Sequence, residues 1–113
     1  MKPTLVAFRK GFSILAQNSK AQTASMVIPV GGQEGGRDNR HRGSDQWLYV
    51  VSGKGEARIN AQVFRLRRRH LLLIERGENH EIRNTGTTPL VTLNLYVPPA
   101  YTPAGEELPR GKP

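Results

Sequence analysis

Short runs of β-prone residues alternate with turn signals along the sequence, and helical periodicity is hard to find anywhere in it. This alternation is typical of an all-β sandwich or barrel. The clearest runs are residues 24–30, 46–51, 56–59, 63–66, 71–74, 80–83 and 91–97. Together with two weaker runs, 4–8 and 12–15, they predict roughly eight antiparallel strands, enough for a jelly roll or closed barrel.

The turn signals indicate how these runs connect. Two Gly-Gly pairs within residues 31–36 mark the end of the first clear run. The stretch Ser52–Gly55 predicts a compact hairpin, and Asn60-Ala61 predicts a further turn. Residues Leu71–Ile74 are continuously apolar, which indicates a strand that is either buried on both sides or part of a barrel wall.

The chain has 113 residues and no cysteine. One domain of this size can bury an adequate core without covalent staples, and disulfides and thiolate metal sites are excluded. We expect a single domain over residues 1–113, with the barrel at about residues 24–97. Residues 98–113 are rich in proline and glycine and should form no regular structure. They could be a disordered arm, or an ordered strap across a barrel mouth or a partner subunit.

The sequence is strongly basic, with 17 Lys and Arg against 9 Asp and Glu and a net charge of +8. Such an excess can attract nucleic acid or an anionic ligand. Binding to single-stranded nucleic acid, however, combines basic groups with exposed aromatics, and the dense basic run at residues 65–70 contains no aromatic ring except that of His70. A solvated basic face is the preferred interpretation, and a nucleic-acid partner is not expected.

The N-terminal residues do not resemble a signal peptide, because no long apolar segment follows Lys2 and Arg9. The longest apolar run, Leu71–Ile74, is far shorter than the ~20 residues that a membrane-spanning helix needs. We therefore expect a soluble cytoplasmic protein with no membrane partner.

Two of the three histidines stand where a barrel could bring them together. His41 lies in a polar loop ahead of the run that begins at Gln46, and His80 begins its own run. Because alternate side chains of a barrel strand point inward, both imidazoles can reach one interior point. The same alternation turns the second residue after each inward one toward the interior as well. The predicted lining of a small-molecule pocket is Asn39, His41, Gln46, Leu48, His80 and Ile82.

This stretch of sequence resembles the two motifs of the cupins. The first cupin motif has two histidines one residue apart, then a glutamate and a Tyr-Val-x-x-Gly segment; its spacing matches Asn39–His41, Gln46 and Tyr49–Gly53. The second motif, Pro-x-Gly-x-x-His-x-x-x-Asn, matches Glu75–Asn84, with the glycine, histidine and asparagine retained. The resemblance runs from about residue 24 to residue 97 and implies a cupin double-stranded β-helix, or jelly-roll barrel.

The resemblance also implies a metal site, because in cupins these positions bind a divalent metal such as iron, manganese, nickel or zinc. The candidate ligands here are His41, His80, Gln46 and Asn39. Asn39 and Gln46 stand where cupins have a histidine and the glutamate, and an amide oxygen is a poor ligand for a transition metal. Strand parity turns Asp45 away from Gln46, so Asp45 could replace the lost carboxylate only across a β-bulge. One divalent metal and none at all are equally compatible with this set.

Three functions fit this pattern. The preferred one is a small-molecule-binding cupin with a weak or altered metal site, because burying His41, Gln46 and His80 without a use would be costly. The alternatives are a metal-dependent enzyme of the dioxygenase or isomerase type, and a structural or regulatory protein without a ligand. Whether the protein is an enzyme is left open.

Trp47 and Tyr49 alternate with Gln46 and should therefore point out of the barrel. Two aromatics on one outer face favour a subunit interface. Small cupins are commonly dimers, so the resemblance implies a homodimer.

Overall fold

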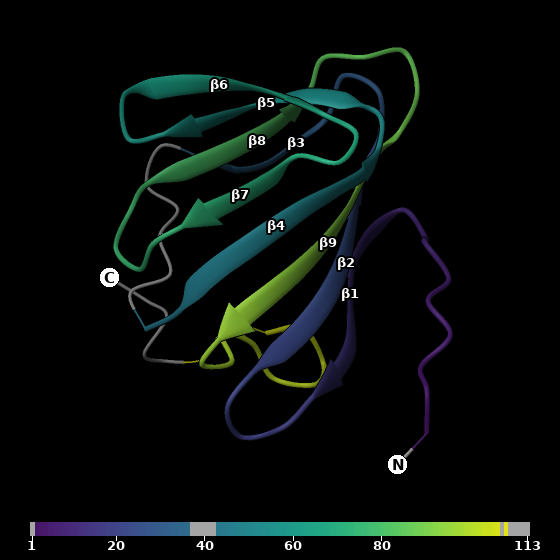
Figure 1. Cartoon of the computed structure of the whole chain (residues 1–113), viewed down its shortest axis with the longest axis vertical. Coiled ribbons are helices and arrows are strands. Elements are labelled where there is room, and N and C mark those ends of the chain that lie inside the picture. Colours follow the sequence, from purple (N-terminus) through teal and green to yellow (C-terminus); the bar gives the residue numbers. More distant parts are fainter. Residues whose placement is uncertain (1, 37–42, 107, 109–113) are drawn as a thin grey trace.

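The computed structural model of the chain describes residues 2–36, 43–106 and 108. In this part of the chain, β-strands form two antiparallel sheets (Figure 1). The strands are β1 (Gly11–Gln17), β2 (Gln22–Ile28), β3 (Gln33–Gly36), β4 (Asp45–Ser52), β5 (Lys54–Ile59), β6 (Gln62–Arg67), β7 (Leu71–Ile74), β8 (His80–Asn84) and β9 (Leu90–Val97).

The sheets are connected in the manner of a jelly roll. The five-stranded sheet has the order β1-β2-β9-β4-β7, and the four-stranded sheet has the order β3-β8-β5-β6. The successive strands β4 and β5, β7 and β8, and β8 and β9 lie in different sheets, so the chain crosses repeatedly between the layers (Figure 1). The predicted all-β double-stranded β-helix is therefore confirmed. The described residues contain no helix, and hence none that could cross a membrane.

The hairpin predicted at Ser52–Gly55 is wrong. β4 pairs with β7 and β9, whereas β5 pairs with β6 and β8, so this turn passes from one sheet to the other. Gly53 has a φ of +93°, and a Cβ on it would lie 2.5 Å from the carbonyl oxygen of Pro89. A glycine is needed here both for the positive φ and for the close approach of the β8–β9 loop. The turn at Asn60-Ala61, by contrast, joins the paired strands β5 and β6 as predicted.

The core lies between the two sheets because buried and exposed side chains alternate along the strands. In β4, Leu48 and Val50 are fully buried while Trp47 and Tyr49 are exposed, which confirms the predicted parity. Burial of a side chain such as Leu48 stabilises the fold by about 1.5–3 kcal/mol. The main cluster combines Met26, Ile28, Leu48, Val50, Ile74 and Leu90 of one sheet with Ala57, Ile59, Leu66 and Ile82 of the other.

Two strand predictions need correction. Residues 4–8 form no strand, and Gln33–Gly36 forms β3 although the flanking glycines predict a turn. β3 is held by pairing with β8, a tertiary contact that local sequence does not encode. Of the two alternatives for Leu71–Ile74, the strand buried on both sides is wrong: β7 is the edge of the five-stranded sheet, and Leu71 is 63% exposed.

The described part of the C-terminal segment is an ordered strap. Ala100 is fully buried, and the side-chain oxygen of Gln22 accepts hydrogen bonds from the backbone N–H groups of Ala100 (3.2 Å) and Tyr101 (3.0 Å). The amide nitrogen of Gln22 donates in turn to the carbonyl oxygen of Tyr101 (2.7 Å). Gln22 is itself fully buried in β2, so the strap is tied to the sheet from inside.

Candidate functional site

A cavity of about 220 Å³ lies where β4 and β8 begin and β9 ends. Its polar lining residues are Glu34, Gln46 and His80, and its aromatic ones are Phe12, Tyr96 and Tyr101. Met26, Gly35 and Ile82 complete the wall. The barrel thus brings three of the predicted site residues, Gln46, His80 and Ile82, into one cavity, although Gln46 lies in a different sheet from the other two.

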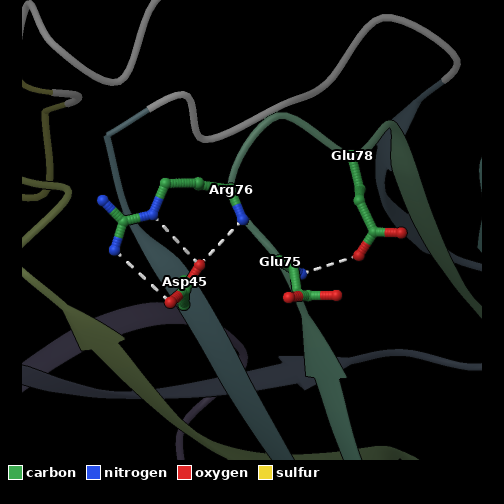
Figure 2. Close-up of polar contacts among 4 residues, drawn as sticks. All are labelled: Asp45, Glu75, Arg76 and Glu78. Carbon is green, nitrogen blue, oxygen red and sulfur yellow. Dashed lines mark hydrogen bonds and ion pairs between the residues drawn. The ribbon is translucent and has the colours of Figure 1, made fainter.

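Asp45 and Arg76 hold the beginnings of β4 and β8 in place. The backbone N–H of Arg76 donates to Asp45 Oδ1 at 2.9 Å, and its guanidinium contacts both carboxylate oxygens at 3.3 and 3.4 Å (Figure 2). These hydrogen bonds keep the pKa of Asp45 below its ordinary value. Asp45 immediately precedes Gln46, and Arg76 lies in the turn before His80, so the contact fixes the two strand ends relative to each other. Asp45 does not line the cavity, as strand parity predicts.

The turn between β7 and β8 also sets the environment of His80. Glu78 accepts a hydrogen bond from the backbone N–H of Glu75 at 2.7 Å, which closes the turn (Figure 2). Burial lowers the pKa of His80, and a hydrogen bond to the Glu78 backbone and the charge of Glu78 oppose this only in part. The neutral imidazole is therefore favoured at neutral pH, and it offers one donor and one acceptor.

Gln46 is held in one orientation by a chain of buried hydrogen bonds. Its Nε2 donates to Asn94 Oδ1 at 3.0 Å, Asn94 Nδ2 donates to Thr92 Oγ1 at 3.0 Å, and Thr92 Oγ1 donates to the carbonyl oxygen of Met26 at 2.8 Å. Within the described part of the chain, no donor reaches the buried Oε1 of Gln46. A buried acceptor without a donor is costly, and Gln46, which lines the cavity, carries one.

Glu34 is a cavity residue that the sequence analysis did not identify. It lies on β3 opposite Ile82 of β8, and directly opposed residues on neighbouring strands share a face, so its side chain points inward with that of Ile82. Partial burial raises the pKa of the Glu34 carboxyl. The available sequence signal is weak, because a glutamate between two Gly-Gly pairs predicts a turn and not an inward-facing strand residue.

Three aromatic rings form the apolar side of the cavity. The ring of Phe12 lies 4.8 Å from that of Tyr101 and 6.4 Å from that of Tyr96, measured between centroids, and the two tyrosine rings lie 5.1 Å apart in an edge arrangement. Burial raises the pKa of Tyr96 far above its ordinary value, so its hydroxyl stays protonated. Phe12 comes from β1 and Tyr101 from the strap, so this wall joins segments from both ends of the sequence.

The remaining predicted site residues have different outcomes. Ile82 lines the cavity, whereas Leu48 lies in the apolar core and does not reach it. His41 and Asn39 lie outside the described residues.

The described donors fit a transition metal poorly. Among residues 2–36, 43–106 and 108, no three His, Asp or Glu side chains gather in a group that could hold a metal ion. His80 and Gln46 supply one imidazole and one neutral amide oxygen, and the amide is a weak ligand for such ions. The same groups are well suited to hydrogen bonding with an organic ligand. Metal binding at this cavity remains a prediction that depends on His41 and Asn39.

Several solved structures are similar to this fold. A protein from Bacillus halodurans is 26% identical with a TM-score of 0.76, over 88% of this chain and 76% of that chain. A Klebsiella pneumoniae protein with a double-stranded beta-helix domain is 18% identical (TM-score 0.70, 76% of this chain and 74% of that one). A predicted oxalate decarboxylase from Thermotoga maritima is 23% identical (TM-score 0.68, 78% and 79%). At these two lower identities the likeness supports the fold alone.

A curated relative and a family profile give the family. The tetracenomycin polyketide synthase protein TcmJ of Streptomyces glaucescens is 30% identical over 79 residues, which is 68% of this chain. The chain spans about half the length of that relative (53%). The profile of the cupin domain matches residues 24–96, which include both motifs and all or most of each strand from β2 to β9, but not β1. The chain therefore belongs to the cupin family.

Proposed function

We propose that the protein binds a small organic molecule in the cavity at the beginning of β4 and β8. The observation that carries this proposal is the convergence of three polar groups, Glu34, Gln46 and His80, on a cavity with an aromatic wall. Few, well-placed polar groups in an otherwise apolar pocket are typical of ligand sites. Neither catalysis nor a bound metal is needed to account for this arrangement.

The lining indicates the chemistry of the ligand. Gln46 Oε1 and the Glu34 carboxylate both accept hydrogen bonds, so the ligand should carry hydroxyl or N–H groups. Phe12 and Tyr101 offer ring surfaces to a flat or apolar carbon frame. At about 220 Å³, the cavity is smaller than typical pockets for drug-sized ligands of roughly 300–1,000 Å³. A single substituted ring, or one end of a longer molecule, fits these limits.

The name of the curated relative is compatible with a ligand of this kind. That protein is called a polyketide synthase protein, and polyketides carry carbonyl and hydroxyl oxygens on a carbon skeleton. We infer that hydroxylated ring compounds, including polyketide-like ones, are the first class of ligand to test.

The test is a binding screen of hydroxylated and keto-substituted monocyclic compounds by ligand-observed NMR, followed by calorimetry on the hits. We expect Glu34→Gln to lower the affinity for the best hit by about tenfold, because a charged hydrogen-bond acceptor is lost. The matched control is Glu81→Gln, on the neighbouring strand β8, whose carboxylate pairs with Arg83 at 2.9 Å and does not line the cavity. Equal affinities for the two variants, or no hits at all, would contradict the proposal.

A metal-dependent enzyme of the dioxygenase or isomerase type is the second candidate. It is favoured by the cupin motifs, in which His41 and His80 occupy ligand positions, and by Glu34, whose raised pKa suits a group that accepts a proton from a substrate. A divalent metal, if held there, would polarise a bound oxygen atom.

Metal content of the purified, untagged protein, measured by mass spectrometry, tests this candidate. Near-stoichiometric metal that disappears in His80→Ala but persists in His70→Ala would support it. Gln46→Glu should then raise the affinity for zinc or nickel, because a carboxylate replaces a neutral amide oxygen. Full metal content in His80→Ala would contradict the assignment of His80 as a metal ligand.

A further inference from the structure

A second hollow, of about 650 Å³, lies at the other end of the barrel from the cavity. Three connections form it: the β4–β5 crossover, the β6–β7 loop and the β8–β9 loop. Ser52 of its lining and Gln46 of the cavity stand at opposite ends of β4, roughly 20 Å apart at about 3.3 Å per residue. We call this hollow the basic groove, because Lys54, Arg67, Arg68 and Arg69 line it.

The positive charge in the basic groove is not compensated by carboxylates. No Asp or Glu of the described residues lines it. The ion pairs found between described residues, Arg76 with Asp45 and Arg83 with Glu81, do not involve its four basic side chains. An adjoining hollow shares Lys54 and Arg67 and contains one carboxylate, that of Glu56. The groove is therefore a local concentration of the chain's excess positive charge.

The loops of the basic groove are fixed by hydrogen bonds. Arg69 N–H donates to the carbonyl oxygen of Val50 at 2.8 Å, and Val50 N–H donates to the carbonyl oxygen of His70 at 2.9 Å. Two backbone hydrogen bonds thus join the β6–β7 loop to Val50 of β4. His70 Nδ1 accepts a hydrogen bond from the backbone N–H of Arg67 at 3.0 Å. Arg69 adopts a φ of +76°, a conformation that costs energy for a residue with a side chain and that is found more often at functional sites.

The β8–β9 loop is tied in a similar way. Buried Asn84 donates from Nδ2 to the carbonyl oxygen of Thr88 (2.9 Å) and accepts at Oδ1 from Gly86 N–H (2.8 Å). Thr85 N–H donates to the carbonyl oxygen of Lys54 at 3.3 Å, which joins this loop to the crossover. The cationic side chains are thus carried by a pre-organised frame, which lowers the ordering cost of binding.

We propose that the basic groove binds a small molecule that carries more than one phosphoryl group. Guanidinium groups form paired, charge-assisted hydrogen bonds with phosphate oxygens, and the hydroxyls of Thr85, Thr87 and Thr88 add neutral donors on the facing loop. The volume of about 650 Å³ lies within the range of small-molecule sites. None of the described residues that line the groove is aromatic, so these residues provide no platform on which nucleic-acid bases could stack. This site is independent of the ligand proposed for the cavity.

Calorimetric titration with tripolyphosphate, at constant ionic strength, tests the proposal. We expect one saturable site on the unmodified protein. The double variant Arg67→Gln/Arg68→Gln should bind at least about tenfold more weakly, because two charge-assisted contacts are lost. The control Lys20→Gln/Arg58→Gln removes the same charge from exposed positions outside the groove and should bind like the unmodified protein. Glu34→Gln should also leave the affinity unchanged, which separates this site from the cavity.

Other results would overturn the proposal. Equal weakening by the control would mean that net charge alone attracts the anion, and an unsaturable titration would mean that no site exists. Tight binding of a single-stranded oligonucleotide that blocks tripolyphosphate and is lost in Arg67→Gln/Arg68→Gln would identify the groove as a nucleic-acid surface instead. If the double variant folds poorly, Lys54→Gln tests the same site from a different loop. We expect this variant to lower the affinity for tripolyphosphate as well.

Discussion

Gln46 on β4 donates a 3.0 Å hydrogen bond from its Nε2 to Oδ1 of Asn94 on the adjacent strand β9, with both side chains buried. Gln46 Nε2 therefore needs the acceptor of Asn94, and Asn94 Oδ1 needs the donor of Gln46. We expect Gln46→Leu and Asn94→Leu each to lower the free energy of unfolding by about 1–3 kcal/mol, because each leaves one buried group unpaired.

The double variant Gln46→Leu/Asn94→Leu should be less destabilised than the sum of the single variants, by at least about 0.5 kcal/mol, because neither partner is then left alone. Urea unfolding of the four proteins measures this coupling. Additive losses would show that the hydrogen bond contributes nothing beyond the packing of the two residues.

Protonation of His80 should destabilise the fold in mild acid. Burial lowers its pKa below the ordinary value of 6.5, so below that pH the unfolded chain takes up a proton more readily than the folded one. Stability should thus fall as the pH drops below 6.5 and level off once the pH is below the folded-state pKa. Denaturant midpoints of the unmodified protein and His80→Gln, measured from pH 8 to pH 5, check this. The variant should lose less stability over the range, and parallel curves would contradict the prediction.

The strap should detach when Gln22 is truncated. Gln22→Ala leaves the N–H groups of buried Ala100 and half-buried Tyr101 without their acceptor, which should cost about 1–3 kcal/mol. Hydrogen exchange of residues 98–106 should accelerate, and ligand affinity should fall because Tyr101 lines the cavity. Gln17→Ala is the control: it removes a 2.6 Å contact of the Gln22 amide but keeps the bonds to the strap. Slow exchange of the strap in Gln22→Ala would show that ring packing alone holds it.

Gly53 should tolerate no side chain. We expect Gly53→Ala to lower stability by more than about 1 kcal/mol, because the new Cβ meets the Pro89 carbonyl oxygen in addition to the strain of a positive φ. Gly77 is a matched control, since its φ is +86° and a Cβ there would meet nothing within 4 Å. Thermal unfolding compares Gly53→Ala with Gly77→Ala. Equal losses would mean that the backbone conformation, and not the close approach, determines the cost.

The homodimer remains a prediction, and the outer face of the five-stranded sheet is its expected interface. Trp47 pairs across the strands with Leu73, and Tyr49 pairs with Leu71, so four exposed apolar side chains adjoin at the sheet edge. An apolar edge of this kind tends to be covered, and a second copy can cover it symmetrically. Trp47→Glu should shift the protein toward monomer in sedimentation equilibrium. Val63→Glu, at an exposed position on β6, should not, and a monomeric unmodified protein would refute the interface.

Strand parity made much of this architecture predictable. Because side chains alternate with a period of two, placing Gln46 and His80 inside the barrel also predicts the burial of Leu48 and Ile82 and the exposure of Trp47, all of which the structure has. Most strand positions followed from the same pattern and from the turn residues that separate the runs.

What the sequence could not predict depends on contacts between distant segments. β3 exists because it pairs with β8, so the local sequence does not predict that Glu34 lies on a strand and faces the cavity. Phe12 and Tyr101 meet at the cavity through contacts that span almost the whole sequence. The turn at Gly53 has the residues of a hairpin, and only the partners of β4 and β5 show that it connects two sheets.

The position of the strap affects how the functional unit of this chain should be delimited. The part that matches the family, residues 24–96, ends before Tyr101 and begins after Phe12, yet both rings line the cavity. A fragment trimmed to those limits would keep both motifs and lose two of the three aromatic rings. Relatives that share the barrel but differ in their flanking segments would accordingly present different walls to a ligand. Selectivity in such proteins can change through the ends of the chain while the barrel and its polar groups stay as they are.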